Sequence, residues 1–435
     1  MKNIRYYLYW GLDALTGGKK RKHYDEIAKI YHQEGDYNSI VSKRLDNILE
    51  YACQKTSFYR NFNPKNIKSF PIISKKDVNE NYNSFFSEDY VNRKDSLRIM
   101  TTSGSTGITF RIYQNPEKVL RNKMDILFFY HIANYDIGDR MYSLRIWTNI
   151  NRKSQLSSFK ENFKMYDTSD LSKEGILSLE KIMRQDRGTK VLSGYASSFA
   201  ELVNNMNEKS RSEAKKWKVK SIISMAEELV LHTKRDLIDI FKCPVVSRYS
   251  NQEMGMFAQQ PASGEDYFLT NEASYLFEFL KLDSDEEAQE DELARIVITD
   301  LFNKAVPLIR YETGDLCTFG IRNNRKYLKT IQGRTNDLLK NSDGELLPPY
   351  VIIYVLWHFK NIIQFQLIQE NLHLVHLKLI HKFENKNEVF KKIENMLLNI
   401  FGNQTTIKIE EVTEIPVEKT GKRKFIISKI WQNKL

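Results

Sequence analysis

The sequence predicts a large α/β domain over residues 1–334 joined to a smaller α+β domain over 335–435. The first observation is that helix and strand patterns alternate from the glycine-containing stretch near residue 100 to about residue 260, as in layered α/β domains. The second is an α-β-β-α-β succession after residue 335, which is typical of a ferredoxin-like domain. The third is composition, because 41% hydrophobic and 12% aromatic residues suffice for a large buried core.

The first part of the large domain, residues 1–95, is predicted to be mostly helical. Between 37 and 54 the apolar residues recur at helical spacing. Residues 96–102 and 108–114 then alternate apolar and polar side chains, which indicates two strands. Asn115-Pro116 opens the next helix, whose buried face is expected to carry Leu120, Met124, Leu127, Phe128 and, as a core histidine, His131.

Between these two strands lies "TTSGSTG" (101–107), a loop of glycines and hydroxyl residues. The P-loop and dinucleotide folds place such a loop between a strand and a helix, and the P-loop adds a lysine that is absent here. A strand–loop–strand arrangement could instead hold phosphate by backbone N–H groups and hydroxyls. The same residues would also serve as a plain polar connection between strands.

Further along, the acidic run 283–292 is expected to be a solvated loop between two strands, without a function of its own. In the small domain we expect a short first strand near 337–346 and a helix after Pro348-Pro349. Strands at 362–369 and 372–380, a helix at 386–401 ended by Gly402, and a strand at 405–412 follow.

The net charge of +11 permits contact with nucleic acid or anionic lipid, but no nucleic-acid motif accompanies it, so no nucleic-acid partner is expected. Three cysteines in unrelated settings fit a reducing cytoplasm, and neither a membrane span nor a secretory signal is recognised. Residues 5–22 place Tyr and Trp side chains before four successive cations. This segment fits either peripheral membrane contact or a helix packed on the body beside a solvated basic turn.

Five motifs occur in one order: "TTSGSTG", "YSNQE" (249–253), "RYETGDL" (310–316), "GRTNDLLK" (333–340) and "EKTGKRKF" (418–425). In this order they resemble the adenylate-forming superfamily of acyl-CoA synthetases and ligases. "SGYASSFAELV" (193–203) and the stretches before the glycine loop resemble its phenylacetate–CoA ligase branch, and more closely the members found in capsular-polysaccharide biosynthesis. The resemblance implies a small β-barrel-like part within the large domain and a mobile C-terminal domain.

The resemblance also implies roles for individual residues. Glu253 would be a catalytic residue that binds Mg²⁺, a cation that prefers hard oxygen ligands. Lys422, carried by the mobile domain, would be the catalytic lysine that meets charge developing on the α-phosphate. The expected ATP-binding residues are Thr102, Ser103, Gly104, Ser105, Thr106, Gly107, Tyr249, Ser250, Asn251, Asp315 and Arg334.

Two positions depart from the family pattern. Asn336 stands where the hinge usually has aspartate, and Ala226 stands where the branch often has glycine before a glutamate, here Glu227. The substrate pocket is less readable. Its candidates are Trp147, Tyr195, Ala196 and Glu227, although Trp147 and Tyr195 also fit as core aromatics.

These residues predict ATP-dependent activation of a small-molecule carboxylic acid as an acyl-adenylate, with transfer to CoA as the thiol acceptor. A second interpretation sends the acyl group to a carrier protein or to an amine or hydroxyl of a sugar in cell-surface polysaccharide biosynthesis. A third is a nucleotide-binding or scaffolding protein without catalysis. ATP, Mg²⁺ and CoA are the expected cofactors and co-substrates. The branch often forms homodimers, but the residues identify no partner surface.

Overall fold

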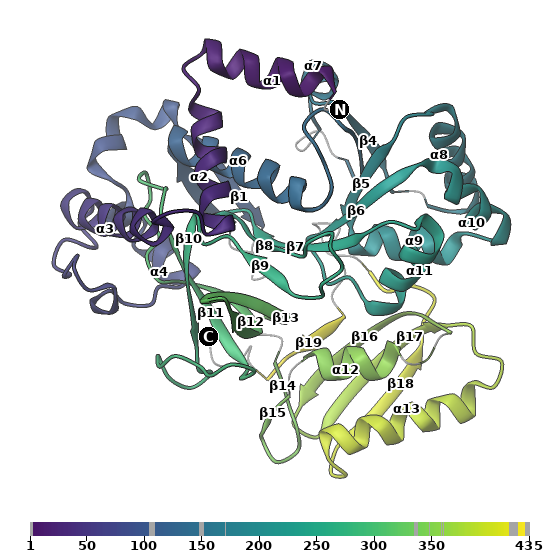
Figure 1. Ribbon diagram of the computed structural model, residues 1–435. Coiled ribbons are helices and arrows are strands. Elements are labelled where there is room, and N and C mark those ends of the chain that lie inside the picture. The colour runs from purple at the N-terminus through teal and green to yellow at the C-terminus, as the bar shows by residue number, and fades with distance from the viewer. Residues whose placement is uncertain are drawn as a thin grey trace. The chain divides into compact units, whose positions relative to one another are not determined.

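A computed structural model describes residues 3–103, 109–147, 152–169, 171–334, 338–347, 349–357, 359, 361–416 and 425–430 (Figure 1). The chain divides into two compact units. The first comprises Met1–Leu229, Thr233–Thr313 and Thr318–Thr330; the second comprises Val230–His232, Gly314–Cys317 and Ile331–Leu435. No described helix is both long and apolar enough to cross a membrane.

The N-terminal part is helical, as predicted from its spacing. Asn3, Asp36 and Ser74 cap three of its helices, each accepting a backbone N–H of the first turn. The helices are α1 (Ile4–Leu15), α2 (Lys19–His32), α3 (Tyr37–Lys55), α4 (Lys75–Glu80) and α5 (Tyr82–Phe85), with 3₁₀ turns at Ile67–Ser69 and Glu88–Ser96.

Two strands flank the glycine loop, which confirms the predicted strand–loop–strand arrangement. β1 (Arg98–Ser103) pairs antiparallel with β2 (Thr109–Gln114), with Ser103 opposite Thr109. Residues 104–108 of the loop lie outside the described residues. α6 (Pro116–Ile132) follows directly and buries Met124 and Phe128, as predicted.

His131, however, is exposed at the end of α6. Its Nδ1 lies 3.0 Å from Asp136 Oδ1, so the expectation of a core histidine was wrong.

The largest sheet of the first unit has eleven strands in the order β10-β11-β12-β13-β9-β8-β7-β6-β5-β3-β4. The strands β3 to β7 pair in parallel, and antiparallel pairing begins between β7 and β8. Where the resemblance implies a small β-barrel-like part, the strands β8 to β13 continue the same sheet as its antiparallel end. The strands are β3 (Arg140–Arg145), β4 (Phe163–Asp167), β5 (Lys190–Tyr195), β6 (Val219–Met225), β7 (Val245–Asn251), β8 (Gly255–Gln259), β9 (Phe268–Thr270), β10 (Tyr275–Leu280), β11 (Ala294–Asp300), β12 (Tyr311–Arg322) and β13 (Arg325–Arg334).

Helices cover both faces of the parallel strands. Leu192 and Ile222 pack in one core cluster with Phe199 and Leu237, whereas their neighbours Val191 and Ile223 belong to another cluster with α6 residues. Successive strand residues point to opposite faces, so this alternation gives the predicted layered α/β arrangement. The helices in this region are α7 (Gln155–Lys160), α8 (Lys173–Gln185), α9 (Ala196–Asn205), α10 (Glu208–Ala214) and α11 (Leu231–Phe241).

The second unit contains the predicted α-β-β-α-β succession. It runs α12 (Pro349–Trp357), β16 (Ile362–Asn371), β17 (Leu374–His381), α13 (Lys386–Phe401) and β18 (Thr406–Glu411). The short first strand expected near 337–346 does not join this sheet. Those residues form a separate hairpin, β14 (Leu339–Lys340) and β15 (Leu346–Leu347), and the sheet order β18-β17-β16-β19 takes its fourth strand from β19 (Ile426–Ser428).

Candidate active site

Glu253 lies in the tight turn between the antiparallel strands β7 and β8. Asn251 closes this turn, because its Oδ1 accepts the N–H groups of Met254 at 2.8 Å and Gly255 at 3.3 Å. Gly255 has φ +121°, and a Cβ there would lie 2.6 Å from Asn122 Oδ1. The turn therefore requires glycine, and it leaves the Glu253 carboxylate half-buried.

Two further segments that are far apart in the sequence meet at this turn. Tyr311 of "RYETGDL" donates its hydroxyl to Glu253 Oε1 at 3.1 Å. Gln114, the last residue of the strand that follows the glycine loop, donates Nε2 to the Glu253 carbonyl at 3.0 Å. The Tyr249 hydroxyl donates to Thr313 Oγ1 at 3.4 Å, so a second bond joins "YSNQE" to "RYETGDL".

An aromatic contact adds to this convergence. The rings of Phe110 on β2 and Tyr311 on β12 are stacked, with centroids 6.4 Å apart and an interplanar angle of 6°. Both side chains are buried. Strand β2 thus packs against β12, and the Gln114 hydrogen bond at its end joins it to the Glu253 turn.

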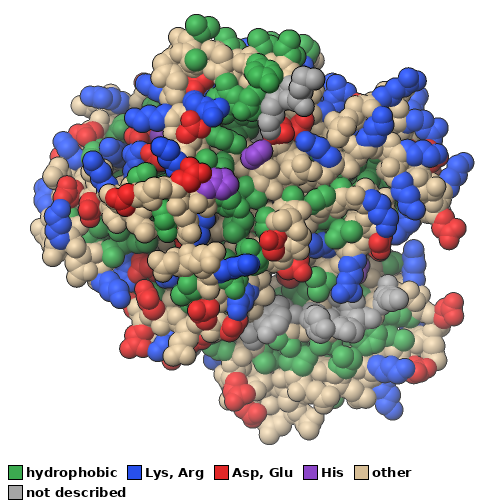
Figure 2. Space-filling view, in the orientation of Figure 1, with side chains coloured by type: hydrophobic (Ala, Val, Ile, Leu, Met, Phe, Trp, Pro, Cys, Tyr) green, Lys and Arg blue, Asp and Glu red, His purple; other side chains and the backbone are tan. Residues whose placement is uncertain are grey.

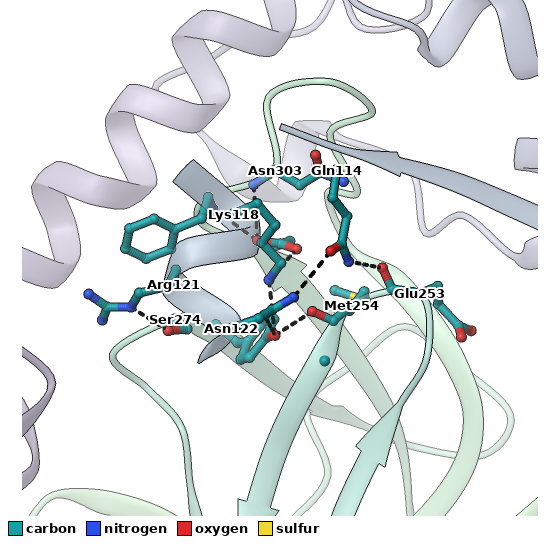
Figure 3. A network of polar contacts seen from close by, with 12 residues as sticks. Gln114, Lys118, Arg121, Asn122, Glu253, Met254, Ser274 and Asn303 are labelled. Atoms are coloured by element: carbon teal, nitrogen blue, oxygen red, sulfur yellow. Dashed lines mark hydrogen bonds and ion pairs between the residues drawn. The ribbon is translucent and has the colours of Figure 1, made fainter. Parts of the chain in front are cut away.

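A buried polar network, drawn in Figure 3, supports the turn from the interior. Lys118 of α6 forms an ion pair with Asp300 of β11, Nζ to Oδ2 2.7 Å, and both side chains are fully buried. Lys118 also donates to the Tyr275 hydroxyl at 3.0 Å, and that hydroxyl donates to the Met254 carbonyl at 2.7 Å. Burial lowers the pKa of Lys118, and the charge of Asp300 opposes that shift.

Sequence reasoning missed this network. Its signal was present on α6, where Lys118, Arg121 and Asp125 share the helical spacing of the apolar residues Met124 and Phe128. Charged residues at core positions of a helix imply buried partners. The partner itself, Asp300, could not be identified from spacing within the helix.

A second group of predicted residues meets at the carboxyl ends of the parallel strands β5 and β6. Tyr195 is opposite Met225 in the register of these strands, and buried Ala196 begins α9. Glu227 Oε2 accepts the N–H of Ser197 at 2.8 Å, which places a carboxylate at the N-terminus of α9. Ligands of open α/β sheets bind at this edge, and the structure brings Tyr195, Ala196 and Glu227 together there.

The turn that presents Glu227 is strained. Ala226 has φ +72°, a left-handed conformation that costs an L-residue other than glycine about 1–2 kcal/mol. This is the position where the branch often has glycine. Ala226 therefore has the left-handed backbone conformation of a glycine but lacks the conformational freedom that lets glycine adopt it without strain.

Trp147 follows β3 and is buried with its polar group satisfied. Its Nε1 donates to the Ser143 carbonyl at 3.2 Å, and the guanidinium of Arg145 lies 3.9 Å from the ring centroid. These contacts are those of a core aromatic, which is the second of the two roles that the sequence allows for Trp147. Ser250 is exposed at the end of β7.

The remaining predicted residues have less structural definition. Asp315 lies half-buried on β12, next to Gly314 with φ +78°. Gly104, Ser105, Thr106, Gly107, Asn336 and Lys422 lie outside the described residues, as do the side chains of Thr102, Ser103 and Arg334. Among the described residues, no three His, Cys, Asp or Glu side chains are grouped to hold a metal ion.

Comparison with solved structures defines the class of fold. The chain is similar to 2-hydroxyisobutyryl-CoA ligase in its postadenylation state, with a TM-score of 0.71 and 15% identity over 91% of this chain and 90% of that one. ATP-bound MatB from Rhodopseudomonas palustris gives a TM-score of 0.55 and 16% identity over 74% of this chain and 65% of that one. The chain has the fold of the adenylate-forming acyl-CoA ligases, as expected from the resemblance of its motifs.

The chain is also similar to CapK in sequence. Residues 339–429 match the family described as the CapK C-terminal domain. The chain is also 22% identical to Protein CapK of Staphylococcus aureus over 446 residues, which cover 94% of this chain and 93% of that protein.

Proposed function

We propose that this chain uses ATP to activate a small-molecule carboxylic acid and then passes the acyl group to the thiol of CoA. In the first step a carboxylate oxygen forms a bond to the α-phosphorus, and the α–β phosphoanhydride breaks to release pyrophosphate. In the second step the thiol sulfur bonds to the acyl carbon, AMP leaves, and the thiol proton goes to solvent.

The observation that carries this proposal is the convergence of motifs on Glu253. Tyr311 of "RYETGDL" and Gln114, at the end of the strand that follows "TTSGSTG", both contact the turn that holds this glutamate. Motifs that only connect separate surface elements would not be expected to lie together at one carboxylate. Adenylation brings two anions together, so a site for it must neutralise charge at one point.

Glu253 fits a site for Mg²⁺ that is shared with a nucleotide. Mg²⁺ commonly uses one or two protein carboxylates and completes its shell with phosphate oxygens and water, so a single glutamate is sufficient. When bound, the ion would neutralise part of the triphosphate charge. Asp315 offers two acceptor oxygens for the ribose hydroxyls. Arg334, Lys422 and the hydroxyls of 102–106 are the remaining residues in the proposed ATP site.

The test is ATP–pyrophosphate exchange with a library of aryl, short-chain and amino acids. We expect exchange with at least one acid, and we expect Glu253→Gln to lower its rate by about 10²-fold or more, the scale of losing one electrostatic contact in a transition state. Lys422→Ala should abolish exchange, while the matched change Lys424→Ala, in the same basic run, should keep it. Absence of exchange with every acid, or full activity of Glu253→Gln, would contradict the proposal.

The acyl acceptor is tested separately. The resemblance to members found in capsular-polysaccharide biosynthesis supports a carrier protein, or an amine or hydroxyl of a sugar, as an alternative to CoA. Mass spectrometry of products formed with each acceptor, from the acid that supports exchange, distinguishes these outcomes. A CoA thioester favours the first acceptor, and CoA-independent acylation of a sugar favours the second.

A further inference from the structure

Helix α1 has one face packed on the first unit and one face that is exposed and apolar. Tyr9 and Trp10 pack against a core cluster that includes Met124 and Phe128, and Asp13 is buried. The opposite face carries large hydrophobic side chains at spacings of three or four residues, which are Ile4 (74% exposed), Tyr7 (61%), Leu8 (57%), Leu12 (61%) and Leu15 (85%). An ordinary surface helix has polar side chains on its outer face, whereas the outer face of α1 is apolar.

The exposed face belongs to a helix that is firmly held. Asp13 accepts the N–H groups of Lys20 at 3.1 Å and Arg21 at 2.8 Å, so its carboxylate joins α1 to the start of α2. At the other end, Arg5 Nη1 donates to the Phe159 carbonyl at 2.6 Å. Because α1 is fixed at both ends, its apolar side chains form a defined surface.

The apolar surface continues onto α7. Leu156 and Phe159 are 64% and 71% exposed, and the Arg5 guanidinium lies 5.1 Å from the Phe159 ring centroid. Figure 1 draws α7 beside one end of α1, and Figure 2 shows hydrophobic side chains gathered along the upper edge of the view where α1 lies. Contiguous exposed apolar patches of this kind mark interaction sites.

Positive charge lies next to this surface. Lys19, Lys20, Arg21 and Lys22 form the first turn of α2. Asp25 pairs with Arg21 at 2.8 Å, and the Lys20 ammonium lies 4.7 Å from the Tyr9 ring centroid. Lys19 and Lys22 are exposed. The partner that fits this surface therefore offers both an apolar layer and anionic groups.

Two properties favour a lipid bilayer over a protein partner. Specific protein interfaces use about 20–30 residues a side, whereas the apolar side chains here occupy one helix and part of a short second one. Lysine is depleted in protein interfaces. A bilayer with anionic lipids attracts cations beside an inserted helix, and each apolar side chain contributes to binding on its own.

We propose that α1 and the first turn of α2 form a membrane-docking surface for bilayers that contain anionic lipid. The apolar face of α1 inserts at the boundary between headgroups and acyl chains, and Lys19 and Lys22 contact lipid phosphates. This surface is independent of the proposed adenylation, and its test needs no substrate.

The test is co-sedimentation of the full chain with vesicles of phosphatidylcholine, with and without phosphatidylglycerol. We expect binding to the anionic vesicles, with the double variant Leu8→Ser/Leu12→Ser reducing it by at least roughly 10-fold, because two inserted side chains are lost. The matched control is Leu177→Ser, which changes a leucine of equal exposure, 61%, on α8. Unchanged binding of the double variant, or no binding of the wild type, would overturn the proposal.

A charge variant tests the anionic component. Lys19→Glu/Lys22→Glu should weaken binding to phosphatidylglycerol vesicles by roughly 10-fold or more, since each cation contributes roughly fivefold. Raising the salt concentration should weaken the wild type similarly. Equal binding to vesicles of phosphatidylcholine alone would overturn the proposed requirement for anionic lipid. A concentration-dependent dimer in analytical ultracentrifugation that Leu8→Ser/Leu12→Ser abolishes would identify a second copy as the occupant and overturn the proposal.

Discussion

Replacing Lys118 by methionine removes one partner of the ion pair beneath the Glu253 turn. At 2.7 Å and an effective dielectric constant of 20, the attraction between Lys118 and Asp300 is about 6 kcal/mol. Removing the lysine also removes its desolvation cost, and Asp300 Oδ1 still accepts the N–H groups of Phe302 and Asn303. We therefore expect Lys118→Met to lower the free energy of unfolding by about 3 kcal/mol, within the range for breaking a buried pair.

The assay is urea unfolding followed by tryptophan fluorescence, since Trp10, Trp147 and Trp217 all lie in the first unit. A double variant, Lys118→Met/Asp300→Asn, is the informative comparison. Asparagine keeps the oxygen that accepts the two N–H groups but carries no charge. The double variant should therefore recover most of the stability lost in the single variant.

A surface ion pair provides the control. Lys65 and Glu50 form a salt bridge with side chains 68% and 42% exposed, so Lys65→Met should leave urea unfolding unchanged. If Lys118→Met behaves like Lys65→Met, or if the double variant is as unstable as the single one, an uncompensated buried charge is not the cause. Either result would refute the reasoning.

Three further changes follow from other contacts. Ala226→Gly should stabilise the chain by about 0.5–1 kcal/mol in urea unfolding, because relief of left-handed strain exceeds the added freedom of the unfolded chain; destabilisation would contradict this. Gln114→Met should raise the Mg²⁺ concentration for half-maximal pyrophosphate exchange severalfold, since the Glu253 carbonyl loses its hydrogen-bond donor. A fall in stability without this shift would contradict the role of Gln114 in positioning Glu253. Burial alone would raise the pKa of Asp186, but hydrogen bonds led by that of Arg140 lower it overall. The Asp186 carboxylate thus stabilises the fold at pH values above the ordinary carboxyl pKa. In an acid titration, the difference in unfolding free energy between wild type and Asp186→Asn should disappear as the pH falls through the lowered pKa of Asp186.

Local patterns determined the parts of the fold that could be predicted. Helix α13 has the expected bounds, 386–401, because its apolar residues keep helical spacing and Gly402, with φ +94°, ends it. The strands around the glycine loop were likewise visible as alternating segments. In each case the signal and the structure it specifies lie within one short stretch of chain.

Features that depend on distant partners were not predictable. The three-residue strand β19 has no pattern of its own and becomes the fourth strand of its sheet only by pairing in parallel with β16. His131 continues the apolar spacing of α6, but the helix ends beside it and leaves the side chain exposed. Lys118 is buried because Asp300 lies opposite, and charged side chains without such a partner remain in water.

The same dependence on distant partners explains how the Glu253 carboxylate is positioned. A glutamate in a two-stranded turn would ordinarily sample many rotamers, and ordering it would oppose ligand binding. Here Tyr311 from β12 holds the carboxylate, while Gln114 from β2 and Tyr275 from β10 hold the carbonyls of the turn. The conformational entropy of the turn is therefore already lost when the first unit folds, so ligand binding does not have to order the turn. If Glu253 holds Mg²⁺, changes in this network should alter metal dependence and leave the choice of carboxylic acid unchanged, because the residues predicted for the substrate pocket, Tyr195 and Glu227, lie on other strands and loops.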